Sequence, residues 1–187
     1  NFRPLDDGTA SGVAANPATL VDYSTADTMA HLLEFDGYFI RGDWTIQGQL
    51  SYGTQKDAAA TADPVSGDLR KAQWWGASAL AAYKFDPRLE GIVRFDYINN
   101  KKNGGGLLGY SFADGRNGIG YDTLGDPEIG ANRTALTLGL SYLFNLNTTF
   151  KAEYRLDRAS QPVFENLSDG SFEKNNQLLA TSVVVSF

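Results

Sequence analysis

The stretch "FKAEYRLD", residues 150–157, alternates strictly between apolar and charged side chains. Successive residues of a β-strand point to opposite faces, so Phe150, Ala152, Tyr154 and Leu156 would share one face. The four residues between them are all charged. A Lys or Arg that faces the middle of a bilayer costs ~2–4 kcal/mol, so the charged face must meet water or opposite charges. The apolar face is the one that can meet lipid or a core.

The same alternation recurs along the chain, for example in "WTIQGQLSY" at 44–52 and "LEGIVRFDY" at 89–97. Such segments are about 12 residues long, whereas ordinary globular strands have ~5–6, and this length suits a tilted crossing of a bilayer. The pattern predicts an all-β fold, a transmembrane antiparallel up-and-down β-barrel. Its seven strands are predicted at 29–41, 44–55, 72–85, 88–100, 132–146, 148–160 and 175–187.

The connections between these strands alternate in length. Gly42-Asp43, Asp86-Pro87 and Asn145–Asn147 are tight hairpin turns, whereas long loops rich in Gly, Asp, Asn and Ser follow the other strands, at 56–71, 101–131 and 161–174. Outer-membrane barrels have short periplasmic turns and long extracellular loops. We therefore expect an outer-membrane location with the same orientation.

Composition excludes several classes of protein. The 187 residues contain 16 Lys and Arg against 22 Asp and Glu, a net charge of −6 that argues against a nucleic-acid partner. There is no Cys and His31 is the single His, so neither a thiolate metal site nor a Ser-His-acid arrangement can be recognised. We predict no enzyme activity, no cofactor and no metal. No apolar run reaches the ~18 residues of a membrane helix.

Aromatic residues gather at the two ends of the predicted strands. Such residues form girdles at the two interfaces of membrane barrels. The set near the short turns is Trp44, Tyr83, Phe85, Tyr142, Phe144, Phe150 and Phe187, and the set near the long loops is Tyr52, Trp74, Trp75 and Tyr97.

Three segments resemble outer-membrane proteins. The final "LLATSVVVSF" resembles the last strand of barrels, which the barrel-assembly machinery recognises; "FDGYFIRGDWTIQGQLSYG" resembles hairpins of phosphate-selective porins. "WWGASALAAYKFDPRLEGIVRFDYINNKKNGGGLLGY" is similar to an uncharacterised family of predicted porins. The resemblance implies a porin-like barrel in contact with outer-membrane lipid and lipopolysaccharide, assembled through the strand that ends at Phe187. It also implies a homotrimer, the assembly that large porins often form.

Seven is an odd number, whereas single-chain bacterial barrels have even numbers of strands. Either "SGVAANPATLVDY" at 11–23 supplies an eighth strand, or the chain is the carboxy-terminal part of a barrel that the resemblance puts at roughly 16 strands. We favour the second interpretation. Residues 1–28 are then an extracellular loop or linker, and residues 29–187 belong to one barrel domain.

Strand alternation also predicts the residues that line the pore. Their charges are mixed in sign, which indicates a hydrated lumen rather than a filter of one sign. Arg94 and Arg155 are the residues expected to contact an anionic solute. Alternatively, Arg94 with Asp96, and Lys151 with Glu153 and neighbouring strands, only pair with one another and stabilise the wall. The predicted pore-lining residues are Glu34, Asp36, Tyr38, Gln47, Gln49, Lys84, Glu90, Arg94, Asp96, Lys151, Glu153, Arg155 and Asp157.

The loop at 101–131 is the longest insertion, and long loops are usually functional. It either folds inward to narrow the pore or caps the surface. Its acidic residues lack the spacing of an EF-hand loop, so a calcium site is not expected. These residues are Asp114, Asp122, Asp126 and Glu128.

The sequence thus predicts a passive outer-membrane channel for small polar or ionic solutes. The alternative is a structural barrel that anchors a surface layer or holds a partner protein in its lumen.

Overall fold

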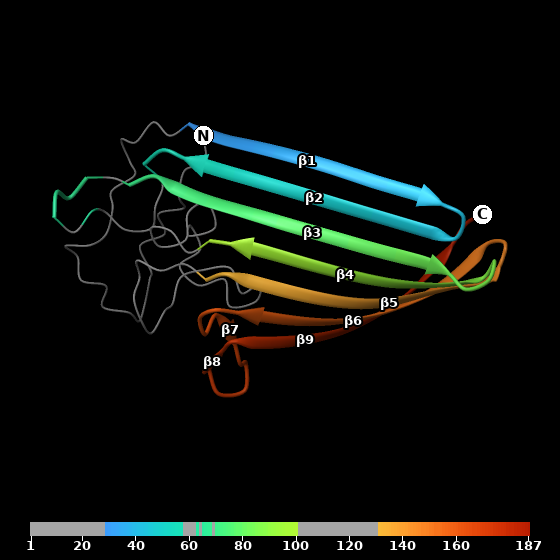
Figure 1. Cartoon of the computed structure of the whole chain (residues 1–187). Coiled ribbons are helices and arrows are strands. Elements are labelled where there is room, and N and C mark those ends of the chain that lie inside the picture. Colours follow the sequence, from blue (N-terminus) through green and yellow to red (C-terminus); the bar gives the residue numbers. More distant parts are fainter. Residues whose placement is uncertain (1–28, 58–62, 64, 69, 101–130) are drawn as a thin grey trace.

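The computed structural model describes residues 29–57, 63, 65–68, 70–100 and 131–187. Seven long strands form one antiparallel sheet in the order β1-β2-β3-β4-β5-β6-β9, so that each strand lies beside the next long strand along the chain (Figure 1). The strands are β1 Ala30–Arg41, β2 Trp44–Gln55, β3 Ala72–Lys84, β4 Leu89–Asn99, β5 Arg133–Asn145, β6 Thr148–Ala159 and β9 Asn175–Val185.

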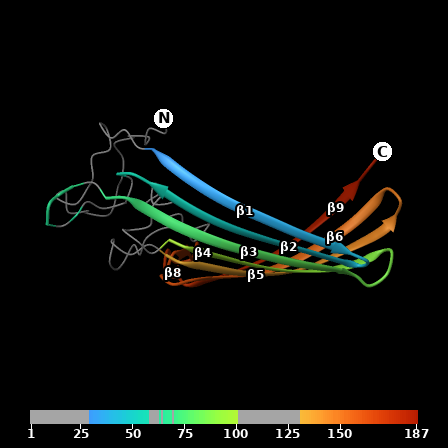
Figure 2. The same ribbon diagram turned by 45° about the horizontal axis from the view of Figure 1, so that its top comes forward.

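The seven predicted strands are confirmed, each with bounds within two residues of those expected. The sheet is open: β1 and β9 form its two edges and do not pair with each other. Figure 2 shows that the sheet is twisted and curved rather than flat. In the part of the chain that the structure describes, no helix is long and apolar enough to cross a membrane.

Short-range hydrogen bonds form the three tight turns, which lie together at one end of the sheet (Figure 1). Gly42 has a φ of 57°, a conformation that glycine adopts without strain, and begins the turn between β1 and β2. Asp86 Oδ1 accepts hydrogen bonds from the amides of Arg88 (2.7 Å) and Leu89 (3.1 Å) in the turn before β4. In the turn before β6, Asn145 Oδ1 accepts one from the amide of Asn147 at 2.9 Å.

The predicted loop at 161–174 contains a small hairpin that the sequence pattern did not indicate. Its strands are β7 Phe164–Glu165 and β8 Phe172–Glu173. The Gly170 amide donates to the Asn166 carbonyl at 2.8 Å, with Gly170 at a φ of 71°. The Ser171 hydroxyl and amide both donate to Asp169, which lowers the pKa of this carboxyl group. The segment therefore has a defined structure of its own.

The pairing register divides the long strands into two faces. We call the side that carries Leu136, Leu138 and Leu140 of β5 the apolar face, and the side that carries Thr137 and Ser141 the polar face. Apart from Arg41 and Arg158, which lie at strand ends, the apolar face of the seven strands carries no Lys, Arg, Asp or Glu. The alternation seen in the sequence is thus maintained across the whole sheet.

Near the long-loop end of β5 and β6, the polar face is the more crowded side. Ala135, Thr137 and Asp157 on this face are 2%, 7% and 4% exposed, whereas the intervening Leu136 and the neighbouring Leu156 on the apolar face are 38% and 39% exposed. This crowding is expected if the sheet curves toward its polar face.

The position of Trp74 differs from the predicted aromatic girdle at the long-loop end. Its register partner is Gly53, and a Cβ added to Gly53 would overlap the Trp74 ring, so the ring lies over the glycine on the polar face. Trp74 is only 7% exposed. The adjacent Trp75 is on the apolar face, because consecutive strand residues point in opposite directions. The prediction placed both tryptophans in one girdle and was wrong for Trp74.

Two predictions concern parts of the chain outside the described residues. They are the extracellular segment at 1–28 and, apart from Ala131, the loop at 101–131 with its acidic set Asp114, Asp122, Asp126 and Glu128.

Candidate functional site

All thirteen predicted pore-lining residues lie on the polar face. By the pairing register, Asp36 of β1 lies opposite Gln49 of β2. The same row across the sheet contains Asp96 of β4 and Asp157 of β6. Corresponding rows contain the other predicted residues, namely Glu34, Tyr38, Gln47, Lys84, Glu90, Arg94, Lys151, Glu153 and Arg155. The same face also carries apolar side chains such as Leu80, Ile92 and Leu178. That this face lines a pore remains a prediction.

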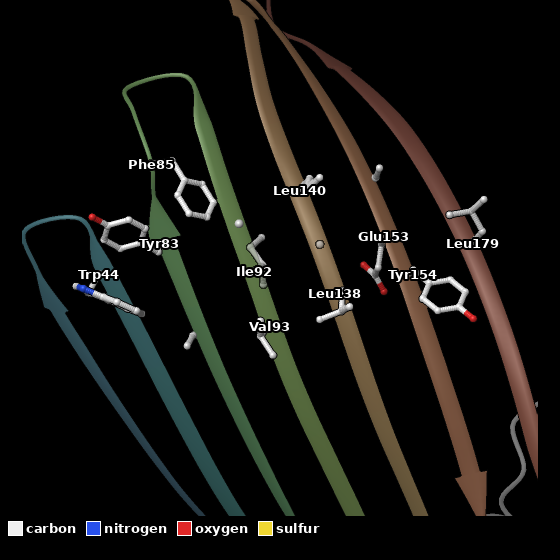
Figure 3. Close-up of a pocket in the computed structure, with 14 residues that line it drawn as sticks. Trp44, Tyr83, Phe85, Ile92, Val93, Leu138, Leu140, Glu153, Tyr154 and Leu179 are labelled. Carbon is white, nitrogen blue, oxygen red and sulfur yellow. The ribbon is translucent and has the colours of Figure 1, made fainter.

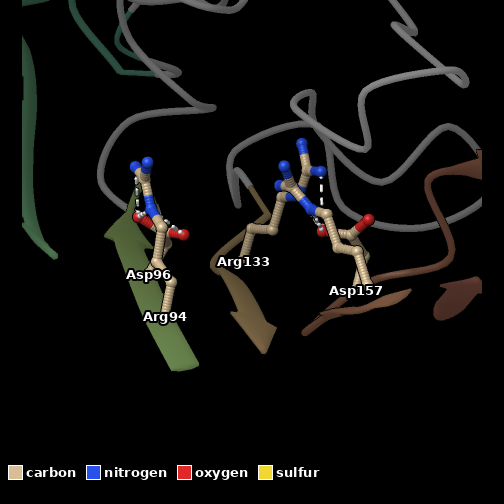
Figure 4. Close-up of polar contacts among 5 residues, drawn as sticks. Arg94, Asp96, Arg133 and Asp157 are labelled. Carbon is tan, nitrogen blue, oxygen red and sulfur yellow. Dashed lines mark hydrogen bonds and ion pairs between the residues drawn. The ribbon is translucent and has the colours of Figure 1, made fainter. Parts of the chain in front are cut away.

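Arg94 and Asp96 form an ion pair within β4. Arg94 Nε lies 2.9 Å from both carboxylate oxygens of Asp96, and its Nη2 lies 2.8 Å from Oδ1 (Figure 4). Ser78 of β3 donates a further hydrogen bond to Asp96 Oδ1 at 2.8 Å. Residues two apart on a strand share a face, which lets the arginine reach the aspartate. The predicted pairing of Arg94 with Asp96 is therefore present.

A second cluster joins β5 and β6 around Asp157, which is buried. Arg133 Nη2 lies 2.7 Å from Asp157 Oδ1, and Arg155 Nε lies 3.0 Å from the same oxygen (Figure 4). The Asp157 side chain is 3% exposed, and those of Arg133 and Arg155 are 15% and 32% exposed. Two guanidinium groups thus compensate one buried carboxylate.

The predicted pairing of Lys151 with Glu153 is absent, because no ion pair joins these residues in the described structure. Elsewhere on the polar face, Glu34 of β1 accepts a hydrogen bond from Gln49 of β2. Lys84 and Glu90 are register partners on β3 and β4. The polar face therefore combines neutralised arginines with acidic and lysine side chains that remain available to water.

Arg133 belongs to this site but is not among the predicted residues. It is the first residue of β5, and its register partners are Ile98 and Ala159, so it lies on the polar face. The sequence contained one usable signal, since Arg133, Thr137 and Ser141 follow the same alternation. Its contacts with residues distant in the sequence could not be inferred from that alternation.

The apolar face is exposed along its whole length. Phe35, Leu50, Leu140 and Val183 are 72%, 58%, 54% and 56% exposed. Folded soluble monomers rarely leave contiguous apolar patches of more than a few hundred Å² in contact with water. Such a face is typical of a surface that contacts another protein or lipid.

Aromatic contacts lie near both ends of the apolar face. At the short-turn end, Trp44 and Tyr83 have ring centroids 4.7 Å apart, and Phe144 and Phe150 have centroids 5.8 Å apart. At the long-loop end, Trp75 and Tyr97 have centroids 5.1 Å apart.

A groove of about 680 Å³ opens among apolar side chains near the short turns (Figure 3). Phe85, Val93, Leu138 and Leu179 are among its lining residues. Gly91 helps to form it, because a Cβ at this position would lie 2.7 Å from Phe85 Cε2. The lining is mostly aromatic and aliphatic, and Glu153 is its charged member.

Within the described ranges, no group of three or more acidic or histidine side chains is arranged to hold a metal ion. The geometry defines a two-faced antiparallel sheet with a charged side and an exposed apolar side. The chain belongs to the family described as "Protein of unknown function (DUF3138)", which matches residues 5–187. No curated protein matches the chain. No solved structure matches it either.

Proposed function

We propose that the chain forms part of a β-barrel in an outer membrane and that its polar face lines a water-filled channel. The channel would pass small polar or ionic solutes by diffusion, without transforming them chemically. The observation that carries this proposal is the separation of charge between the two faces. Charged side chains lie along the polar face, whereas the middle of the apolar face carries none.

The dimensions of the apolar face support a bilayer environment. Trp44 and Tyr52 belong to the aromatic residues at opposite ends of β2, eight positions apart. At a strand rise of ~3.4 Å per residue, this separation is ~27 Å along the strand. Tilting shortens its projection, which remains comparable to the apolar band of ~25 Å that barrels present to lipid.

The connections support an orientation. In this proposal the short turns before β2, β4 and β6 lie on the periplasmic side, and the long connections lie on the extracellular side, toward lipopolysaccharide. The same proposal includes two expectations from the sequence resemblance. The barrel-assembly machinery would recognise the last strand, and the barrel would form a homotrimer.

Fluorescence of the neighbouring tryptophans tests the membrane environment. Two variants, Trp44→Phe/Trp74→Phe and Trp44→Phe/Trp75→Phe, retain only Trp75 or only Trp74. In vesicles of lipids brominated on the upper acyl chain, we expect strong quenching of Trp75 and little quenching of Trp74. Equal quenching of both residues, or of neither, would contradict the assignment of the apolar face to lipid.

Ion conductance tests the channel itself. Protein reconstituted in planar bilayers should give discrete open steps, and its migration in detergent gels should differ between unheated and boiled samples. A barrel that is heat-modifiable and correctly inserted but gives no conductance would exclude the channel. It would favour the alternative, a structural barrel that anchors a surface layer or holds a partner.

A further inference from the structure

The β7–β8 hairpin packs against the polar face at the long-loop end of the sheet. Val163 and Phe164 are 3% and 4% exposed and form a buried cluster with Ala131 and Ala159. Ala159, the last residue of β6, lies on the polar face by register. The cluster therefore joins the hairpin to that side of the wall.

Backbone hydrogen bonds fix both ends of the hairpin. The Val163 amide donates to the Glu173 carbonyl at 3.0 Å, and the Ala159 amide donates to the Lys174 carbonyl at 2.7 Å. The first bond closes the base of the hairpin, and the second connects its end to β6. The hairpin is therefore attached to the sheet at a defined position, the end of β6.

Arg133 connects the hairpin to the charged part of the polar face. Its guanidinium carbon lies 5.7 Å from the centroid of the Phe164 ring, within the range of a cation–π contact. The same guanidinium group is bound by buried Asp157, which also binds Arg155. The Asp157 carboxylate therefore orients both Arg133, which lies against the hairpin, and Arg155, which lies on β6.

We propose that Arg133 is a positioning residue that holds the β7–β8 hairpin against the polar face, and that the hairpin thereby borders the mouth of the channel. The second part rests on the proposed function. Arg133 suits this role because its planar guanidinium group can stack on an aromatic ring while it donates to a carboxylate. Loss of either contact would release the hairpin, while the backbone pairing of the seven long strands would remain.

Cleavage after Glu165, which lies within β7 of the hairpin, by a glutamate-specific protease measures this release. Cleavage of a locally opened segment follows the population of the open form when reclosing is fast. Arg133→Gln removes both the charge-assisted hydrogen bonds and the cation–π contact, so we expect cleavage of the reconstituted protein to be about tenfold faster. Phe164→Ala changes only the hairpin side and should accelerate the same cut even if the Arg133 variant folds poorly.

Arg94→Gln is the matched control, because it breaks an arginine–aspartate pair on β4, two strands away from β6, from which the hairpin extends. Its cleavage rate should equal that of the unchanged protein. Equal rates in all variants would overturn the positioning role of Arg133. Acceleration in the control as well would also overturn it, since general loosening would then explain the result.

Conductance separates this proposal from the proposed function. If the unchanged protein gives no channels but the two variants are cleaved faster, the channel fails and the positioning role stands. If channels form and Arg133→Gln accelerates cleavage without changing open-channel current noise, the hairpin does not border the mouth. Increased noise in both Arg133→Gln and Phe164→Ala, compared with the unchanged protein, would support both parts.

Discussion

Arg94 of β4 and Arg155 of β6 lie in one row across the sheet, because Thr137 of β5 is the register partner of both. Each arginine is followed two residues later by an aspartate that binds it, Asp96 or Asp157. The same arginine–aspartate pair therefore occurs in the same row on β4 and β6, two strands that run in the same direction. These guanidinium groups already have carboxylate partners, so in the proposed channel their effect on an anion would be weaker than their number suggests.

Reversing the charge of both arginines tests this row. We expect Arg94→Glu/Arg155→Glu to shift the permeability ratio several-fold toward cations, measured as the reversal potential in a salt gradient. Arg41→Glu/Arg158→Glu makes the same change in charge at the ends of the apolar face and should cause little shift. An unchanged reversal potential in the first variant would exclude its two arginines from selectivity.

Asp157 should contribute strongly to stability. Removing one partner of a buried ion pair costs about 3–5 kcal/mol, because the other charges lose their compensation. We expect Asp157→Asn to lower the free energy of unfolding by roughly that amount in denaturant titrations from lipid vesicles. Asp36→Asn, at an exposed position that forms no ion pair with the other described residues, should change it by less than about 0.5 kcal/mol. Similar values for the two variants would contradict a structural role for the Asp157 cluster.

The two faces should respond differently to the same substitution. Leu138→Arg would place a charge in the middle of the apolar face and should cost about 2–4 kcal/mol of stability in a bilayer. Ser141→Arg on the polar face of the same strand should cost far less, because this side chain can reach water. The measurement is the free energy of unfolding in vesicles, together with the folded yield. A larger loss from the polar-face variant would reverse the assignment of the faces.

Gly53 should tolerate no larger residue without movement of Trp74. A Cβ at Gly53 would overlap the ring, so we expect Gly53→Ala to cost about 1–3 kcal/mol, as overpacking does. Gly48 lies on the same strand, but its nearest neighbour would be the Ser78 carbonyl oxygen at 4.0 Å, and Gly48→Ala should be nearly neutral. Near-ultraviolet circular dichroism should also change only for Gly53→Ala. Equal effects of the two variants would argue against the stacked position of Trp74.

Most of the long strands could be predicted closely because one physical signal, alternation of apolar and polar side chains, runs through them, most clearly in β2, β4 and β6. That alternation also placed Glu153 and Arg155 on the same face. It did not identify the β7–β8 hairpin, whose strands have two residues each and are too short to show a period. Nor did it identify the contact between Arg133 and Phe164, which depends on how the connection after β6 folds back.

Trp74 shows a second limit of the sequence pattern. Its neighbourhood, "AQWWGASALAA", is rich in small and apolar residues on both faces, so hydrophobicity alone does not distinguish the two tryptophans. The register with β2 does, because it pairs Trp74 with Gly53 and Trp75 with Tyr52. Only long-range pairing decides which ring stacks on a glycine.

The open edges of the sheet have an energetic consequence. β1 has 12 residues, and in an antiparallel ladder about half of them direct their amide and carbonyl groups away from the single neighbouring strand. In hydrocarbon, each such group without a partner costs several kcal/mol, so one bare edge would cost tens of kcal/mol. Hydrocarbon can therefore surround this sheet only when the edges β1 and β9 are both hydrogen-bonded, either to each other or to further strands.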